Sequence, residues 1–337
     1  MTTPRDAALP VGLIGLGKHG VRYLTHLQAD VPALRLAALC RKDAAQGRAL
    51  AGELGVAFHA DPEELIADPG VRAVIAVVPP IEHARIVAAV ARERKPLLLE
   101  KPFAIDLANG IRQREQLAAR AVPCLVAHTL RYSPVVRLLR RRAPELGRLH
   151  QIVLGKSFEP TRLAWLDDPR SSGGGNILHT GVHMFDLLRH LSGAEVATVS
   201  CHTARVTTRQ TEDSFTASMT VALAGGPPLL AAVAGSRTTR SRYGEIRLIG
   251  ENGQLAADHL HGHVALITDR QETVVATLAD EPTVLAVLQE FAQVASAGVA
   301  PSITPDDGLA AVAIADACYR SAASGRAVPV WPREERE

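Results

Sequence analysis

The sequence predicts a two-domain α/β protein that begins with a doubly wound parallel sheet. In the first third of the chain, short apolar segments alternate with segments of helical period, which is the pattern of strand–helix–strand units in a parallel sheet. From Ala194 onward, alternating apolar and polar residues between glycine and proline turns predict antiparallel strands instead. The 337 residues are enough for two domains with separate cores.

The first strand, predicted over residues 11–14, runs directly into the sequence GLGKHG. Its three glycines have GxGxxG spacing, and a segment of helical period follows them. In such a turn the first glycine permits the bend, the second lets backbone approach a pyrophosphate, and the third lets helix pack on strand. The helix N-terminus adds free N–H groups and partial positive charge. Ordinary loops also contain glycines, but this context predicts a dinucleotide site on Gly15, Gly17, Lys18, His19 and Gly20.

The end of the second predicted strand, LRLAALC, bears on the choice of cofactor. An acidic residue there would bond the ribose 2′-hydroxyl and favour NAD(H). Instead, Arg41 and Lys42 occupy the tip and Asp43 comes one or two positions late. Two cations suit a 2′-phosphate, so the sequence favours NADP(H), with NAD(H) as the alternative if Asp43 still reaches the ribose.

Strands and helices continue to alternate up to residue 128. Strands are predicted in GVAFHA, VRAVIAVV, PLLLE and VPCLVAH, and helices in EHARIVAAVARER and LANGIRQREQLAAR. The sequence VVPP ends the fourth strand and fixes a loop at the ligand edge of the sheet. Val78, Pro79 and His83 are therefore candidate cofactor contacts, although His83 is equally consistent with a surface residue at a helix start.

Glu100 and Lys101 follow the fifth strand at the same edge and are further candidate cofactor contacts. Pro102 restricts Lys101 to extended backbone. A lysine held beside a nicotinamide can hydrogen-bond a substrate oxygen, or take part in proton transfer once burial and the positive ring lower its pKa. Composition alone favours a solvated pair at a strand end.

The segment SSGGGNILHTGVHMFDLLRH carries a few polar residues on a helix that is otherwise apolar nearly all round. At about 100° per residue, four polar side chains fall within one sector of roughly 60°: His179, His183, Asp186 and His190. Asn176 is predicted to cap the start of the helix. A narrow polar stripe on a buried helix must be satisfied by partners or line a cavity.

Three interpretations of this stripe compete. Core residues bonded to their neighbours are the favoured interpretation for Asp186 and His190. His179 and His183 have the i, i+4 spacing of metal ligands, but no HExxH glutamate or further ligand cluster accompanies them, so no metal is predicted. The third interpretation is a proton-handling site that faces the nicotinamide.

The motifs together resemble the Gfo/Idh/MocA family, named after glucose–fructose oxidoreductase, inositol dehydrogenase and rhizopine catabolism proteins. VGLIGLGKHG, VVPPIEHARIVAAVA, LLLEKPFA and GGGNILHTGVHMFDLL occur in the family's order, and the similarity extends from about Leu9 to Val330. The resemblance implies a Rossmann domain, then an α+β domain whose large, open antiparallel sheet commonly forms the subunit interface. It implies hydride transfer between NAD(P) and a carbinol carbon of a sugar, cyclitol or related polyol. It assigns proton transfer to His183 of the GxH sequence, with Lys101 on the substrate oxygen.

One position departs from the family pattern. The family usually has aspartate four residues before the catalytic histidine, where this chain has His179. An imidazole both donates and accepts, and two imidazoles one turn apart repel when both are charged. We therefore predict His179 as the partner of His183 in catalysis or as a substrate contact. The alternatives are reduction of another carbonyl, an imine or a dihydrodiol, or a catalytically silent nucleotide-binding sensor or scaffold.

Three residues of the second part complete the candidate site. Arg131 and Tyr132 follow the sixth strand, where a similar RxxP stretch in the family borders cofactor and substrate; Arg131 is a candidate cofactor contact and Tyr132 a candidate substrate contact. Trp165 precedes the glycines and either walls the substrate pocket or packs in the core.

The expected domains are a nucleotide-binding domain over 1–128, a substrate-binding and oligomerisation domain over 129–330, and a charged tail over 331–337. Two closing helices are predicted over 283–297 and 305–324, and the second has the option of packing back on the first domain. We expect a homodimer or homotetramer through the C-terminal sheet.

Composition excludes several classes of protein. The formal net charge of +2 gives no electrostatic footprint for nucleic acid or an anionic membrane. The four scattered cysteines form no CxxC sequence and indicate reduced thiols. Neither a signal peptide nor a membrane span is evident. We therefore expect a cytoplasmic enzyme with a small-molecule substrate.

Overall fold

The computed structural model describes residues 8–161, 163–223 and 226–331. The chain divides into two compact units, of which the first runs up to Thr129 and includes Pro282–Leu309. The second comprises Leu130–Glu281 and the chain from Ala310 onward, so the division falls within the last helix. The predicted fold class, a parallel α/β domain with a mostly antiparallel α+β domain, is confirmed. The predicted tail lies outside the described residues except for Trp331.

The first unit is built on a six-stranded parallel sheet in the order β3-β2-β1-β4-β5-β6. This is the doubly wound order, in which ligands bind beyond the carboxyl ends of the strands. Every residue of its central strands β4 and β5 is buried, as expected where helices cover both faces. The strands are β1 (Leu9–Ile14), β2 (Leu34–Cys40), β3 (Ala57–His59), β4 (Ala73–Ala76), β5 (Leu97–Glu100) and β6 (Cys124–Ala127).

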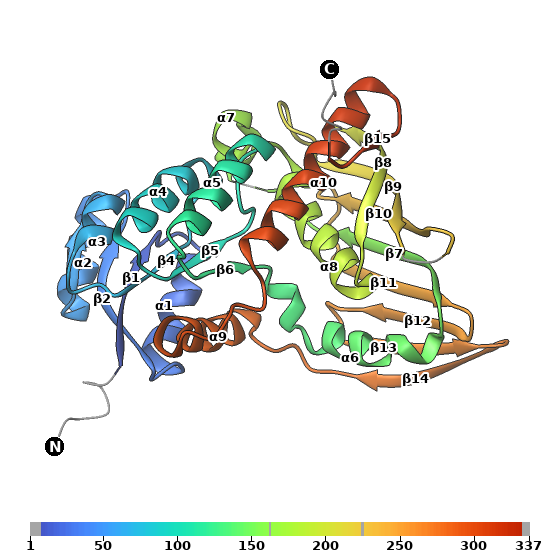
Figure 1. Ribbon diagram of the computed structural model, residues 1–337, viewed down its shortest axis with the longest axis horizontal. Helices are drawn as coiled ribbons and strands as arrows, with labels where there is room; N and C mark the ends of the chain where they lie inside the picture. Colours follow the sequence, from blue (N-terminus) through green and yellow to red (C-terminus); the bar gives the residue numbers. More distant parts are fainter. Residues whose placement is uncertain (1–7, 162, 224–225, 332–337) are drawn as a thin grey trace. The chain divides into compact units, whose positions relative to one another are not determined.

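Helices lie on both faces of this sheet, with α1 and α9 on one side and α4 and α5 on the other (Figure 1). Aspartates at Asp43, Asp61 and Asp106 cap α2, α3 and α5 through their side chains. The helices are α1 (Gly20–Ala29), α2 (Ala44–Leu54), α3 (Pro62–Ala67), α4 (His83–Glu93), α5 (Leu107–Ala119) and α9 (Thr283–Ala297).

The second unit is built on a nine-stranded sheet in the order β14-β13-β12-β11-β7-β10-β9-β8-β15. Its neighbouring strands are antiparallel except β7 and β10, which run parallel. The strands are β7 (Leu149–Ser157), β8 (Glu195–Ala204), β9 (Ser214–Ala222), β10 (Leu229–Ser236), β11 (Tyr243–Gly250), β12 (Gly253–Asp258), β13 (His263–Thr268), β14 (Gln271–Thr277) and β15 (Val328–Pro329).

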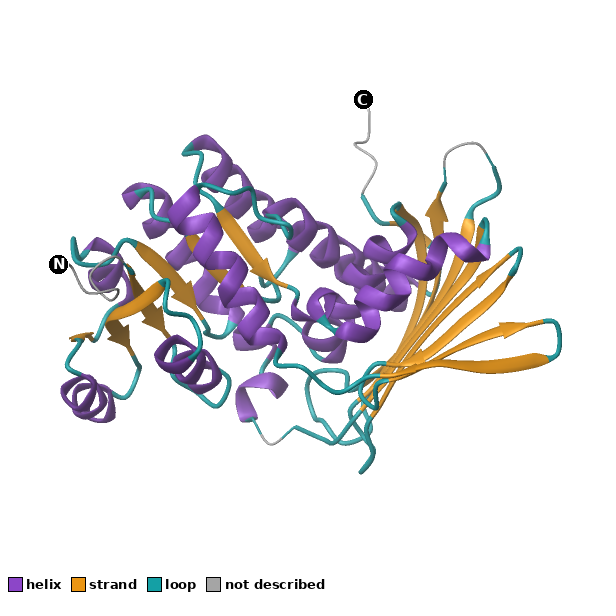
Figure 2. Ribbon diagram, turned by 90° about the horizontal axis from the view of Figure 1, so that it is seen from below, coloured by secondary structure: helices purple, strands orange, loops and turns teal. Residues whose placement is uncertain are grey.

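Only one face of this sheet is covered by the described helices of its own unit (Figure 2). On that inner face Phe215 of β9 packs edge-to-face against Phe185 of α8, with ring centroids 6.1 Å apart. The opposite, outer face carries small and polar side chains and the half-exposed Leu230. The helices are α6 (Pro134–Arg142), α7 (Pro169–Ser172), α8 (Val182–Ser192) and α10 (Pro305–Ser324). None of the helices in the described ranges combines the length and apolar character that a membrane span requires.

Candidate active site

The glycine turn between β1 and α1 has the geometry of a dinucleotide cradle. Gly15 has φ +92°, and a Cβ there would lie 2.1 Å from the Val77 carbonyl oxygen. A Cβ on Gly20 would lie 2.0 Å from the Gly15 carbonyl oxygen, so the helix start packs directly on the turn. At Gly17, by contrast, a Cβ would meet nothing within 4 Å. The turn is therefore closed at its first and third glycines and open at the second, where backbone must approach a pyrophosphate.

Glu100, the last residue of β5, ties this turn to the Lys101 segment. Its Oε1 accepts hydrogen bonds from the Tyr23 hydroxyl at 2.6 Å and from the His19 ring Nε2 at 2.7 Å. Its Oε2 accepts from the Lys101 backbone N–H at 3.1 Å. Burial acts to raise the pKa of the Glu100 carboxyl, but these donors and the neighbouring charges lower it below its ordinary value. The peptide bond from Lys101 to Pro102 is cis. His19 and Glu100 thus lie together at the turn.

His83 joins two loops at the carboxyl edge of the sheet. Its ring has no exposed surface; Nε2 lies 3.2 Å from the Val78 carbonyl oxygen and Nδ1 lies 3.4 Å from that of Phe103. Burial lowers the pKa of His83, so the ring is neutral and donates to one of the two carbonyls at a time. This geometry favours a role in ordering the loops that carry Val78, Pro79 and Pro102 over direct contact with a cofactor.

At the end of β2, the three charged residues differ in what they bond. Asp43 caps α2 by accepting from the Gln46 backbone N–H at 3.0 Å. The Arg41 guanidinium donates to the Gln46 side-chain oxygen at 2.5 Å. Lys18 and Lys42 have exposed side chains. The acidic group that would favour NAD(H) is therefore engaged by the helix N-terminus.

The histidine segment of the second unit begins as a π-helix over Ile177–Gly181 and continues as α8. The Val182 N–H donates to the Ile177 carbonyl, five residues back. The prediction of one regular helix through all four polar positions is therefore wrong. The wider turn rotates His179 away from the α-helical register of the residues that follow it.

Each member of the predicted polar stripe has its own environment. The His179 ring is buried, its Nε2 lies 3.0 Å from the Ser172 carbonyl oxygen, and the Trp165 ring packs edge-to-face on it at 5.4 Å. Asp186 is buried and holds Arg131 in a two-pronged ion pair, with nitrogen–oxygen distances of 2.5 and 2.8 Å. The favoured interpretation of Asp186 as a satisfied core residue is thus confirmed. His183 and His190 are both half-buried.

Three further positions show how the structure uses predicted residues. Tyr132 is only 8 % exposed and carries the Arg137 guanidinium 5.8 Å from its ring centre. The Arg131 guanidinium donates hydrogen bonds from Nε and Nη2 to the Asp186 carboxylate. Asn176 does not cap the helix, because its side chain bonds no backbone N–H there. The prediction that Asn176 is a cap is wrong, since the Glu212 carboxylate binds the backbone N–H groups at the helix start.

Glu212 is the residue of this segment that the sequence did not single out. Its carboxylate accepts from the N–H groups of Gly175 and Ile177, at 3.1 and 2.8 Å, and from the Tyr319 hydroxyl at 3.0 Å. Burial raises the pKa of Glu212 above its ordinary value. A Cβ on Gly175 would lie 1.9 Å from the Glu212 carbonyl oxygen. The only sequence signal for this anchor is the run of three glycines, which indicates close approach without naming its partner.

Among the residues that the structure describes, no three His, Cys, Asp or Glu side chains are grouped to hold a metal ion. The cysteines Cys40, Cys124, Cys201 and Cys318 are all buried free thiols. Burial raises the pKa of Cys40 to about 11, which keeps its thiol protonated.

Comparison with known proteins identifies the fold and the family. A model of the oxidoreductase family with an NAD-binding Rossmann fold matches residues 9–128. The family's model of the C-terminal alpha/beta domain matches residues 143–330. The chain belongs to the Gfo/Idh/MocA oxidoreductase family. The resemblance predicted from the motifs is confirmed over nearly the whole described chain.

Two curated relatives and one solved structure illustrate the family's range. The scyllo-inositol 2-dehydrogenase (NAD(+)) of Bacillus subtilis is 31% identical over 193 residues, 56% of each chain. Inositol 2-dehydrogenase 1 of Saccharopolyspora erythraea is 29% identical over 341 residues, covering 95% of this chain and 96% of the relative. A levoglucosan dehydrogenase, solved in complex with NADH and levoglucosan, superposes with a TM-score of 0.84 at 20% identity, covering 96% of this chain and all of that one. That likeness shows the shared Gfo/Idh/MocA fold.

Proposed function

We propose that this oxidoreductase transfers a hydride between a nicotinamide cofactor and a carbinol or carbonyl carbon of a sugar, cyclitol or related polyol. The observation that carries the proposal is an intact dinucleotide turn in a chain that also has Lys101 and His183 at the family's motif positions. Relatives named inositol and scyllo-inositol dehydrogenases support the substrate class. A silent sensor is not favoured, because both motif residues are retained.

The proposed role of each side chain follows from the direction in which the proton is transferred. A bound nicotinamide would supply the redox chemistry, as hydride acceptor when the carbinol carbon is oxidised and as hydride donor when the carbonyl carbon is reduced. His183 takes the hydroxyl proton, and in reduction it returns a proton to the carbonyl oxygen. Lys101 donates a hydrogen bond to the same oxygen in both directions. We propose that His179, whose Nε2 lies on the Ser172 carbonyl, acts through Nδ1 on His183 or on a substrate hydroxyl.

NADP(H) is the proposed preferred cofactor, with NAD(H) as the alternative. Arg41 and Lys42 supply positive charge near the predicted ribose position, and Asp43 is engaged as a helix cap. The cap uses Oδ1 of Asp43, and the NAD(H) alternative requires its second carboxylate oxygen to reach the ribose 2′-hydroxyl. Titration of the chain with each dinucleotide tests this choice: tighter binding of NADP⁺ than NAD⁺ supports it, and the reverse order contradicts it.

Substitution of the two motif residues tests the proposed chemistry. Lys101→Ala and His183→Ala should each bind the cofactor as the wild type does and lose turnover by about 10²-fold or more, because each removes a group that acts on the reacting oxygen. Turnover is followed by nicotinamide absorbance on a polyol and keto-sugar panel. His150→Ala, an exposed histidine on β7, is the matched control and should retain wild-type rates. Normal turnover in both motif variants would overturn the mechanism.

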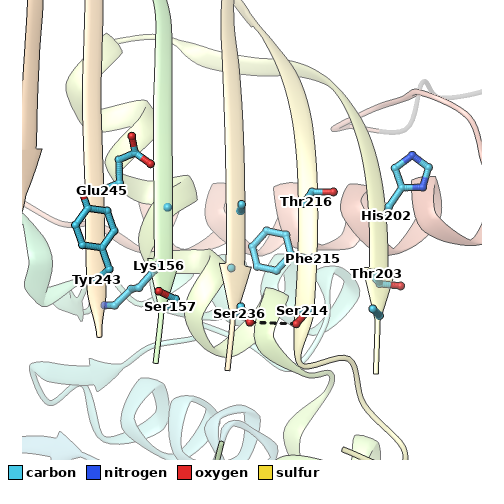
Figure 3. A pocket seen from close by; sticks show the side chains of 14 residues that line it. Lys156, Ser157, His202, Thr203, Ser214, Phe215, Thr216, Ser236, Tyr243 and Glu245 are labelled. Carbon is cyan, nitrogen blue, oxygen red and sulfur yellow. Dashed lines mark hydrogen bonds between the residues drawn. The ribbon is translucent and has the colours of Figure 1, made fainter. Parts of the chain in front are cut away.

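We also propose that the outer face of the nine-stranded sheet forms a homodimer or homotetramer interface. On this face the exposed Thr216, Ala234 and Tyr243 alternate with buried residues such as Phe215 along their strands. They line a hollow of about 450 Å³ that spans five neighbouring strands, β11, β7, β10, β9 and β8 (Figure 3). A wide sheet face without helices is a surface that association can cover.

A further inference from the structure

A half-buried arginine near the inner face of the nine-stranded sheet has no ion-pair partner among the described residues. Arg237 follows the last residue of β10, and its Nε is buried with no hydrogen-bond partner. Its guanidinium carbon lies 5.1 Å from the Phe158 ring centre, and the guanidinium forms no hydrogen bond or ion pair with a side chain in the described residues. Arg237 keeps partial exposure, so an edge of the guanidinium stays accessible. A desolvated cation without a counter-ion is costly and calls for a partner.

Three carboxylates on segments that adjoin Arg237 or Phe158 are already engaged. Asp213, which bonds the Arg237 N–H through its backbone carbonyl, directs its carboxylate to the loop that begins at Val206. Glu212 accepts from the glycine segment and Tyr319. Glu159 pairs with Arg242 at 2.8 Å. None of these three neutralises Arg237, and no carboxylate within residues 8–161, 163–223 or 226–331 forms an ion pair with it, so an anionic ligand is a candidate counter-ion.

A second group with unmet hydrogen-bond capacity lies beside the same strand. Asn176 is 1 % exposed, and neither its side-chain oxygen nor its nitrogen has a partner. Its Nδ2 lies 3.0 Å from the position a Cβ would take on Gly235, two residues before Arg237 on the same side of the strand. An unpaired amide buried in this way costs about 1–3 kcal/mol. Asn176 also belongs to the helical segment that carries His183, seven residues further on.

The surroundings of Arg237 are positive. Lys156 of β7 places its ammonium 6.0 Å from the centre of the same Phe158 ring. Burial, assisted by the charge of Lys156, lowers the pKa of His259 to about 3, so this histidine adds no charge of its own. Arg240, in the loop after Arg237, is exposed. A ligand that approaches Arg237 therefore meets cations and an aromatic ring.

We propose that Arg237, supported by Asn176 and Phe158, forms an oxyanion subsite, so that the polyol substrate of this enzyme carries a carboxylate or a phosphate. The planar guanidinium fork matches either oxyanion, and a neutral polyol would leave the cation unpaired. This inference rests on the proposed function, since it names the class of substrate for the same chemistry. Sugar acids and sugar phosphates share the recognised group, and the test separates them.

The test is equilibrium binding to the full chain, measured by calorimetry with and without NADP⁺. The ligands are D-gluconate and D-glucuronate as carboxylates, D-glucose 6-phosphate as the phosphate, and D-glucose and myo-inositol as neutral polyols. At least one acidic ligand should bind about tenfold or more tighter than the neutral ones, and Arg237→Gln should abolish that advantage while leaving neutral binding within about twofold. The better acidic class then identifies the oxyanion.

Two further variants serve as controls for this test. Arg242→Gln removes an exposed arginine of the same loop that already has a carboxylate partner, and should bind every ligand as the wild type does. Arg237→Lys keeps the charge without the fork and should show an intermediate affinity for acids, which keeps the test available should Arg237→Gln fail to fold. Equal loss of acidic and neutral ligands in the Arg237 variants, or no acidic preference in the wild type, would overturn the subsite. Acid-selective binding without turnover would instead contradict hydride transfer and leave the subsite standing.

Discussion

Glu100 is the residue at which the nucleotide turn and the Lys101 segment meet. Its carboxylate accepts hydrogen bonds from Tyr23 and His19 on one side and from the Lys101 N–H on the other. Because the carboxylate is buried, each donor that keeps it ionised contributes to the free energy of folding. The position of Lys101 is thus linked to residues that the sequence places some 80 positions earlier.

Tyr23→Phe should lower the free energy of unfolding by about 1–2 kcal/mol at pH 7, because it removes a donor from a buried carboxylate. The pKa of Glu100 is lowered in the fold, so this contribution is present above the ordinary value of 4.5 and is lost as pH falls further. Urea unfolding at pH 7 and at pH 4 measures the difference, which should narrow at the lower pH. Gln28→Ala, at an exposed position of the same helix as Tyr23, is the control and should show no effect. A pH-independent deficit in Tyr23→Phe would contradict this account.

Asp167 anchors the loop between β8 and β9 in the second unit. Its carboxylate accepts three backbone N–H groups, from Arg209, Gln210 and Thr211, each at 2.9 Å. Burial acts to raise the pKa of Asp167, but these donors outweigh it and hold the pKa at about 2. The anchor is therefore strongest when the carboxyl is ionised.

Asp167→Asn should lower the free energy of unfolding by about 1–2 kcal/mol at pH 7, because a neutral amide accepts these bonds less strongly. The stabilisation by Asp167 is fully present above its ordinary pKa of 3.8 and disappears as pH falls through about 2. Thermal unfolding from pH 7 to pH 2 should show the two proteins converging. Asp280→Asn, an exposed aspartate, should follow the wild type throughout. A gap that persists at pH 2 would show that the carboxylate charge is not the cause.

At the scale of single elements, the glycine turn was predictable from sequence and the histidine segment was not. Three glycines after a strand restrict the backbone so strongly that spacing alone indicates the turn. The segment with His179 and His183 kept the apolar pattern of a helix, but that pattern does not reveal a π turn, which depends on how the segment packs. The Arg131–Asp186 pair and the Glu212 anchor also join residues that are distant in sequence, so no local sequence pattern predicts them.

The glycine turn offers a paired prediction at this scale. Gly20→Ala should destabilise the chain by about 1–3 kcal/mol, because its Cβ would meet the Gly15 carbonyl at 2.0 Å and the backbone must shift. Gly17→Ala should change stability by no more than about 0.5 kcal/mol, since its Cβ meets nothing, yet it should weaken dinucleotide binding about tenfold or more. Thermal unfolding without cofactor and dinucleotide titration separate the two effects. If Gly17→Ala bound the dinucleotide with wild-type affinity, the turn would not be part of the cofactor site.

At the scale of the whole molecule, the sequence predicted both sheets but not the full extent of the second one. Alternation indicated β8 to β11, whereas β7 and the three strands β12 to β14 were not singled out. The same alternation that defines a strand with one buried face says little about what covers the other face. The bare outer face of this sheet is therefore a structural finding, and its use in assembly is open to direct measurement.

Leu230→Arg tests the proposed assembly. Leu230 lies on β10, which is central in the sheet, and is 52 % exposed on the outer face. If copies of the chain associate through this face, a guanidinium at this position would be desolvated without a partner, and the dimer or tetramer should dissociate to monomers. Light scattering coupled to size-exclusion chromatography reports the mass. Val206→Arg places the same charge on a loop residue that is 64 % exposed and should leave the assembly intact. A monomeric wild type, or an unchanged mass in Leu230→Arg, would show that this face is not the interface.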